Sequence, residues 1–340
     1  MDSLFGDSAH RLFAQAYPTD VLRAVERGQA PGAAWQAVEA SGFLDALVPE
    51  AAGGAGLRLA DVAPLAQAAG WHGVGAPVIQ TMLARAWLHA AGHAPQSGPI
   101  ALAPWTAPAG ADGVQARAVG AARAAQWVLA AGPDADGARL LAVADAQATP
   151  SGGHGSLDAD LRWPSAAVAA AAPLTVPDTA LHDLAATACA GLIAGALERI
   201  LQLTVEYASQ RSQFGKPIGR FQAVQQQISV LAEQVWAVRA AAQLAFQSQD
   251  WMPRPLLAAQ AKARASAAVA RAADIAHAVH GAIGITAEYD LQCYTRRLRE
   301  WRHAAGGEQY WNARIGRDAL AARDLSALDY VRTCLYAVAA

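Results

Sequence analysis

The sequence predicts a mainly α-helical protein with a small β domain inserted between two helical parts. Apolar residues recur with helical spacing over residues 1–98 and again over residues 179–340. Between them, residues 99–178 alternate short apolar segments with Gly, Pro and Asp, a pattern typical of strands and turns. The chain has 340 residues, which is more than one ordinary domain needs. We therefore expect three domains, 1–98, 99–178 and 179–340.

Helices joined by Gly/Pro loops are expected in the N-terminal part. Helical spacing runs through "AAWQAVEASGFLDAL", "DVAPLAQAAGWHG" and "VIQTMLARAWLHAAG". The stretch "VPEAAGGAG", residues 48–56, is a cluster of turn-forming residues and predicts a loop.

Short strands are expected in the middle part, in a small antiparallel unit. The candidates are "PIALAPW", "QWVLAAG" and "RLLAVAD". The last segment, "SAAVAAAAPLTVPD" (residues 165–178), fits either a final strand or a linker, and its pattern does not separate the two.

Long helices with short connections are expected in the C-terminal part, as in an up-down bundle. The apolar periodicity predicts helices over 179–210, 221–248, 255–281 and 290–304, and a last one beginning near Gly307. The longest apolar run, Leu184 to Leu197, stops at Glu198. Because a membrane span needs about 20 apolar residues, we expect a buried core helix here and no membrane span.

Composition argues against several classes of function. Net charge is -2, from 26 basic and 28 acidic residues, and no basic arm stands out, so a nucleic-acid partner is not expected. Cys189, Cys293 and Cys334 are odd in number and far apart. This spacing argues against a disulfide framework or a metal site and fits a reducing, cytoplasmic location. The charged N-terminus does not have the pattern of a signal peptide.

One polar segment, "SQRSQFGKPIGRFQAVQQQ" (residues 209–227), separates two long helical stretches. Gly215 allows an unusual backbone turn and Pro217 cannot continue a helix, so a helix–helix connection is expected. Arginines beside a loop with exposed amides can bind a pyrophosphate. The alternative is an ordinary connection with solvated arginines. We call this segment the joint.

Three motifs in the same order resemble the acyl-CoA dehydrogenase family. "RSQFGKPIGRFQAVQQQ" resembles its Arg-x-x-Phe-Gly…Phe-Gln segment, and "VHGAIGITAEYDLQCYTRRLR" is similar to its Gly-Gly-x-Gly-[Phe/Tyr] helix junction. "GFLDALVPEAAGGAG" is similar to its N-terminal Gly-Phe…Pro-Glu…Gly-Gly-x-Gly stretch. Ala278 and Ala282 depart from the second motif, where relatives often have Gln and the second Gly.

The resemblance implies a helical domain, a β domain and a four-helix bundle, with FAD as cofactor. It also implies oxidation of an acyl-CoA thioester to the 2,3-enoyl-CoA, with electron-transfer flavoprotein as the acceptor. In relatives, the joint's Arg, Phe and Gln contact the diphosphate and adenine of FAD in the neighbouring subunit. The matching residues here are Arg211, Phe214 and Gln222.

Further residues follow from the same resemblance. Gly281 and Gly284 would lie near the adenine end of FAD. Gln213 and Lys216 belong to the joint motif, and a role in binding FAD stays open for both.

The resemblance fails at the catalytic base. The glutamate that most relatives use aligns with Ala305, whether counted from the glycine motif or from the last helix. The second location known in the family aligns with Ala185. Glu308 is the nearest substitute, although it equally fits an acid favoured by a helix N-terminus. His303 could act as a base and equally fits a solvated surface residue.

The middle domain also departs from the family. The Thr-Glu-Pro-x-x-Gly-Ser-Asp loop and the Trp-Ile-x-Asn strand, which hold the flavin and the acyl-CoA, have no counterpart. "TAPAGADGVQ", residues 106–115, is the nearest remnant, and residues 99–178 are fewer than usual. The joint motif that would bind a neighbour's FAD is therefore kept. The middle-domain motifs and the base that would act with the chain's own FAD are mostly lost.

Three hypotheses remain. The first is a non-catalytic subunit that helps a catalytic partner bind FAD in an α2β2 complex, as known in the family for the breakdown of steroid side chains and other bulky acyl-CoA substrates. The second is an active homo-oligomeric dehydrogenase with Glu308 as base. The third is a non-enzymatic helical interaction protein. The acyl substrate is not encoded in these motifs, although a reduced middle domain favours a bulky or ring-bearing CoA thioester.

Overall fold

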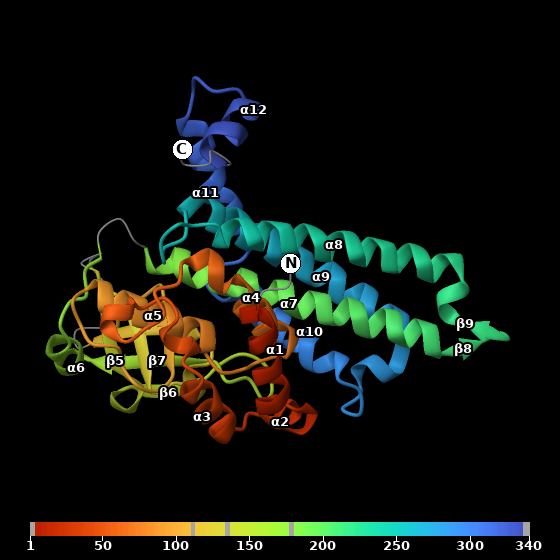
Figure 1. The fold of residues 1–340 in the computed structure, drawn as a ribbon, viewed down its shortest axis with the longest axis horizontal. Coiled ribbons are helices and arrows are strands. Elements are labelled where there is room, and N and C mark those ends of the chain that lie inside the picture. The colour runs from red at the N-terminus through yellow and green to blue at the C-terminus, as the bar shows by residue number, and fades with distance from the viewer. Residues whose placement is uncertain (1–3, 110–112, 133–136, 177–179, 336–340) are drawn as a thin grey trace.

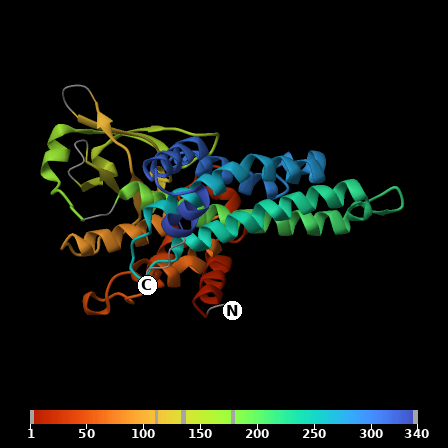
Figure 2. The same ribbon diagram turned by 90° about the horizontal axis from the view of Figure 1, so that it is seen from above.

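The computed structural model describes residues 4–109, 113–132, 137–176 and 180–335. The N-terminal helices and the β region form a broad body, and long helices extend from it to one side (Figure 1). Seen from above, the joint lies at the far tip of these helices (Figure 2).

Five helices form the N-terminal part, in agreement with the predicted periodicity. They are α1 (Leu4–Ala16), α2 (Thr19–Val25), α3 (Gly32–Ala40), α4 (Leu59–Trp71) and α5 (Val78–Ala90). The Asp61 carboxylate accepts a hydrogen bond from the Arg58 backbone amide at 3.0 Å and thereby fixes the start of α4. The predicted loop 48–56 contains one short 3-10 turn, Glu50–Ala52.

Two small sheets form the β region. One has the strand order β1-β4-β5 and the other β2-β3-β7-β6. The strands are β1 (Ile100–Ala103), β2 (Ala107–Pro108), β3 (Gly113–Val119), β4 (Trp127–Ala131), β5 (Ala138–Ala142), β6 (Gln147–Pro150) and β7 (Ala159–Pro164). Side chains of both sheets, among them the fully buried Trp163, share one core cluster, so the sheets pack face to face.

The sheets differ from the predicted antiparallel unit in one pairing. β1 and β4 are parallel, whereas the other pairs of strands in the two sheets are antiparallel. The chain passes through β2 and β3 of the other sheet before it returns to β4, and this excursion allows a parallel pairing.

The segment 165–178 is not the predicted strand or plain linker. Its first residues form a helix, α6 (Ser165–Ala170), and Leu174 then makes an isolated antiparallel bridge with Ala138. Alanine has the highest helix propensity, so this alanine-rich segment forms a short helix, which packs against β3, β5 and β7. Residues 177 and 178 lie outside the described residues.

The C-terminal helices begin and end close to the predicted positions. They are α7 (Leu181–Gln210), α8 (Gln222–Phe246), α9 (Pro255–His280), α10 (Leu291–His303), α11 (Glu308–Ala321) and α12 (Ala327–Tyr330). Helix α7 is long and apolar enough to cross a membrane by length and composition, but 83% of its most apolar window is buried within the fold. It is the central core helix, as expected from the run 184–197.

Close backbone contact joins α7 to α4. A Cβ at Gly195 would lie 1.8 Å from the Gln67 carbonyl oxygen, so only glycine fits at that crossing. One core cluster contains side chains of the N-terminal helices, of strands β1 and β4, and of the bundle. Because the three parts share this core, the division into 1–98, 99–178 and 179–340 stays a prediction.

Candidate functional site

The joint is a two-residue β-hairpin between α7 and α8. Strands β8 (Ser212–Gln213) and β9 (Lys216–Pro217) pair antiparallel around Phe214 and Gly215. The φ angles are 51° at Phe214 and 77° at Gly215. Both turn residues thus occupy the left-handed region that a tight hairpin of this kind requires. Such a backbone conformation is uncommon for a residue with a bulky side chain, and here the pairing of β8 with β9 imposes it on Phe214.

The predicted contact residues of the joint point outward. The Phe214 side chain is 90% exposed, and Arg211, Gln213 and Gln222 are also exposed. Lys216 differs from them, because its Nζ lies 4.4 Å from the centre of the Phe221 ring, in a cation–π contact within the joint. An exposed guanidinium, two amides and an aromatic ring can contact a ligand that lies outside this chain.

The glycine motif lies at the same end of the bundle. The His280 ring stacks on Tyr207 with 4.5 Å between ring centres, and the Tyr207 carbonyl accepts from the Arg211 amide at 2.8 Å. Gly281 is exposed, with φ of 65°. Gly284 is buried, and a Cβ there would lie 3.0 Å from the His280 Cβ. Gly284 therefore serves packing, while Gly281 is open to a ligand.

The two alanines predicted to occupy the base positions face one pocket. Ala185 on α7 and Ala305 in the α10–α11 loop both line a pocket of about 110 Å³ between the β region and the bundle. Its lining also includes Leu102 and Ala103 of β1 and residues 117–120 of β3 and the following turn. No Asp or Glu is among the described residues that line it.

A buried lysine fixes the loop that carries Ala305. Lys262 on α9 is fully buried, and its Nζ donates to the carbonyls of Arg302 and Gly306, each at 2.8 Å, and to Ser266 Oγ at 2.7 Å. Burial lowers the pKa of Lys262 to about 8. Trp311 Nε1 also donates to the Ala305 carbonyl at 2.7 Å. These bonds hold Ala305 at φ of 54°, a strained conformation for alanine.

Aromatic side chains fill the space beside this loop. Trp105, at the end of β1, stacks on His182 and makes an edge contact with Tyr310, with 5.3 Å between the ring centres of the latter pair. A Cβ at Gly306 would lie 3.2 Å from the Trp105 ring and 2.9 Å from the Tyr310 ring. Trp105 also lines the pocket, so this aromatic cluster borders it.

The structure separates the two candidate substitutes for the base. Glu308, at the first turn of α11, pairs with the Arg302 guanidinium through two hydrogen bonds. The hydrogen bond from Arg302 lowers the pKa of Glu308 to about 2, and Glu308 does not line the pocket. His303 does line the pocket and is exposed. A useful base has a pKa near the working pH, which argues against Glu308.

Several pocket residues were not predicted from the sequence. Gln80, Trp105, Arg117 and Cys189 come from four separate elements and share no motif. A tryptophan directly before the remnant "TAPAGADGVQ" was the one available signal. Within that remnant, Thr106 Oγ1 donates to the Ala131 carbonyl at 2.8 Å, and residues 110–112 lie outside the described residues. Cys189 and Cys293 are buried free thiols.

Comparisons with known proteins agree with the fold and identify the family. The model "Acyl-CoA dehydrogenase, N-terminal domain" matches residues 2–97, and "Acyl-CoA dehydrogenase, C-terminal domain" matches residues 176–320. The acyl-CoA dehydrogenase IpdE2 of Mycobacterium tuberculosis is 34% identical over 256 residues, which cover 74% of this chain and 75% of the relative.

Two solved structures have the same fold over most of their length. The ChsE4–ChsE5 complex from Mycobacterium tuberculosis matches with a TM-score of 0.80 at 22% identity, covering 93% of this chain and 96% of the matched chain. A variant of the Tcur3481–Tcur3483 steroid ACAD matches with a TM-score of 0.79 at 25% identity, covering 95% and 98%. Two family models in order, a relative of this identity and coverage, and a shared fold lead to one conclusion: the chain belongs to the acyl-CoA dehydrogenase family, a family of oxidoreductases.

Proposed function

We propose that this chain is the non-catalytic subunit of a heteromeric FAD-dependent acyl-CoA dehydrogenase, and that its joint helps bind the FAD of a catalytic partner. One observation carries the proposal. Both base positions, Ala185 and Ala305, face a single small pocket without a carboxylate, while the joint that would contact a neighbour's FAD is intact and exposed.

The pocket does not fit the flavin ring. Pockets that hold cofactors and drug-sized ligands measure about 300–1,000 Å³. This one measures about 110 Å³, and Trp105 and Tyr310 pack against Gly306 beside it. We therefore assign no step of the dehydrogenation to this pocket.

The joint does fit the opposite end of FAD. Arg211 can bind a phosphate through two parallel hydrogen bonds, and Phe214 offers an exposed ring for stacking. Gln222 is the first residue of α8, where backbone amides and the helix dipole favour an anion. When bound, FAD accepts the hydride from the acyl-CoA. In this proposal the present chain only binds and orients the adenine-diphosphate end of FAD.

The relatives support a heteromeric assembly. ChsE4–ChsE5 and Tcur3481–Tcur3483 are named as pairs of proteins, and the second is named a steroid ACAD. We propose an α2β2 complex with a catalytic subunit that oxidises a bulky acyl-CoA to its 2,3-enoyl-CoA, with electron-transfer flavoprotein as acceptor.

Co-expression with a candidate catalytic subunit tests the proposal. The purified complex should carry about one FAD for each pair of unlike subunits, and this chain alone should carry none. Full turnover by this chain alone would favour the homo-oligomeric dehydrogenase. A complex without any flavin would favour a non-enzymatic interaction protein.

A further inference from the structure

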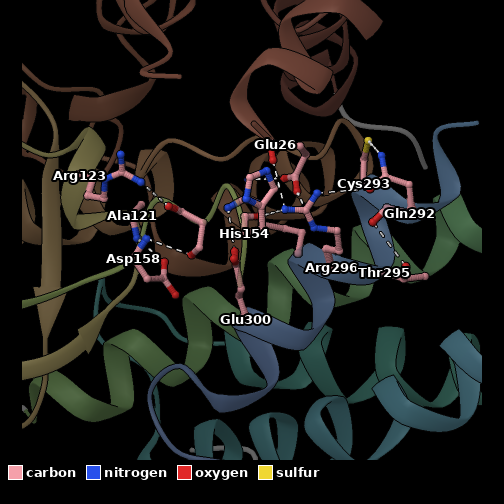
Figure 3. A network of polar contacts seen from close by, with 12 residues as sticks. Glu26, Ala121, Arg123, His154, Asp158, Gln292, Cys293, Thr295, Arg296 and Glu300 are labelled. Carbon is pink, nitrogen blue, oxygen red and sulfur yellow. Dashed lines mark hydrogen bonds and ion pairs between the residues drawn. The ribbon is translucent and has the colours of Figure 1, made fainter. Parts of the chain in front are cut away.

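A loop of the β region is held between α2 and α10. Residues 152–158 precede β7, and Arg296 of α10 donates to the His154 carbonyl (Figure 3). Arg123 donates to the Ser156 carbonyl at 2.8 Å. A Cβ at Gly155 would lie 2.1 Å from the Glu26 carbonyl oxygen, which shows how closely the loop approaches the end of α2.

Behind this loop lies a cluster of charged side chains in which carboxylates outnumber guanidinium groups. Arg297 of α10 is 3% exposed and donates to Glu26 and, at 3.0 Å, to Glu300 Oε2. Asp158 is 8% exposed, and its Oδ1 accepts from the Ala121 amide at 2.9 Å. An ionised Asp158 would be a third carboxylate around this one buried guanidinium, and Arg296 lies at the edge of the cluster, 3.9 Å from Glu26.

A small cavity joins Asp158 to helix α5. It measures about 30 Å³, room for one water molecule, and both Asp158 and Gln80 line it. Gln80 Oε1 is buried and accepts no hydrogen bond from the described residues. A buried acceptor without a donor is costly. An ionised carboxylate has no hydrogen to offer, whereas a protonated one carries an O–H donor.

We propose that Asp158 and Gln80 form a proton-dependent contact, direct or through one water molecule, that holds the β region against helix α5. The proton comes from solvent and binds the Asp158 carboxylate oxygen that faces the cavity. The resulting O–H donates toward Gln80 Oε1, while Oδ1 keeps its bond from Ala121. Loss of the proton removes the donor and places an additional negative charge beside Glu300 and Glu26.

The surroundings of Asp158 favour the protonated form up to about pH 6, well above the ordinary range of an aspartate. Burial raises its pKa to about 6, the charges of Glu300 and Glu26 act in the same direction, and the Ala121 amide and Arg297 oppose them. The Cys189 thiol of α7 lines the same cavity. Since the folded protein binds this proton more tightly than the unfolded chain, the contribution is present below about pH 4 and is lost as pH rises through about 6.

The Asp158–Gln80 contact also affects the position of one wall of the pocket of about 110 Å³. The turn 118–121 carries two alanines in left-handed conformations, Ala118 at φ of 47° and Ala121 at 56°. Ala118 lines the 110 Å³ pocket and Ala121 lines the small cavity, and Asp158 holds Ala121 directly. The Asp158–Gln80 contact thus positions one wall of the pocket against α5.

Thermal and urea unfolding of the full chain at pH 5 and pH 7 tests the proposal, with Asp158→Asn as the matched variant. The asparagine keeps the acceptor for Ala121 and supplies a permanent N–H donor for Gln80. Relative to this variant, the unfolding equilibrium constant of the wild type should rise roughly ten-fold from pH 5 to pH 7, as linkage to a pKa of about 6 requires. Equal pH dependence in both proteins would overturn the proposal.

If Asp158→Asn does not fold, the variant Gln80→Met and infrared difference spectra still test the proposal. Gln80→Met removes the acceptor with little change in shape, and it should reduce the wild-type pH dependence because neutral Asp158 loses its partner. Infrared difference spectra between pH 5 and pH 7 should show a protonated carboxyl band that shifts in Gln80→Met. A band that is unchanged by Gln80→Met would show that the proton on Asp158 does not depend on Gln80.

Discussion

Ala185 of helix α7 and Ala305 of the α10–α11 loop line the same pocket. Helix α7 and the α10–α11 loop therefore meet at this pocket, and each presents a methyl group at a position predicted to align with the base of the acyl-CoA dehydrogenase family. A base that had only moved from one of these positions to the other would leave a carboxylate at one of them. Since both are alanine, neither position supplies a base.

Restoring the carboxylate should not restore the reaction. Ala305→Glu places a base at the usual position, but the pocket of about 110 Å³ leaves no room for a flavin ring. We expect no dehydrogenation of acyl-CoA by the variant chain alone. The φ of 54° at this position is strained for alanine and glutamate alike, at about 1–3 kcal/mol, and the variant's folding is verified by circular dichroism. Ala185→Glu, on regular helix, is the companion variant, and turnover by either would contradict the account.

Removing Arg211 should weaken FAD binding in the complex. A hydrogen bond to a charged group contributes about 1.5–3 kcal/mol, so Arg211→Ala should raise the Kd for FAD roughly 10–100-fold. Fluorescence titration of the complex with FAD measures this. Arg317→Ala is the matched control, because Arg317 is also exposed and lies on α11, away from the joint (Figure 1). An equal loss in both variants would argue against a specific role for the joint.

Glu308 should contribute to stability and not to catalysis. Glu308→Gln should leave turnover of the complex unchanged, since the carboxylate is paired with Arg302 and does not line the pocket. The pKa of Glu308 is lowered to about 2, so its contribution is present above about pH 4.5 and is lost as pH falls toward 2. We expect a loss of about 1 kcal/mol at pH 7 in urea unfolding and none near pH 2. A fall in turnover with intact folding would revive the homo-oligomeric dehydrogenase.

Lys262 should stabilise the loop that carries Ala305. Lys262→Met leaves the carbonyls of Arg302 and Gly306 without their donor, and we expect a loss of about 3 kcal/mol in the free energy of unfolding at pH 7. Lys216→Met is the control, because the Lys216 contact with Phe221 lies on the joint surface. The folded-state pKa of Lys262 is about 8, below the ordinary 10.5, so the wild type should gain stability relative to Lys262→Met as pH rises from 8 to 10. A wild type that loses stability over that range would contradict the assignment.

The helices and the joint were predictable because their signals are local. Helix α7 ends at Gln210, where the periodicity ends, and Gly215 takes the left-handed turn that a glycine at that position indicates. The meeting of Ala185 and Ala305, the packing of Trp105 on Gly306, and the Asp158–Gln80 cavity were not predictable. They depend on tertiary contacts between residues that are distant in the chain, and no periodicity or motif encodes them.

Two smaller differences have the same physical origin. The parallel pairing of β1 with β4 depends on the path of the chain through the second sheet, and the helix at Ser165–Ala170 packs against β3 and β5, which are distant in the chain, as well as against β7. Gly284 is buried against His280, which the glycine motif did not indicate, and its place near the adenine end of FAD stays a prediction.

Our central proposal is that this chain helps another subunit bind FAD and binds no FAD of its own. The FAD content of the complex co-purified with its catalytic partner, determined by flavin absorbance against subunit masses from native mass spectrometry, tests it most directly. The account predicts about one FAD for each pair of unlike subunits and no FAD on this chain alone. One FAD for every chain in the complex, or flavin bound to this chain by itself, would contradict it.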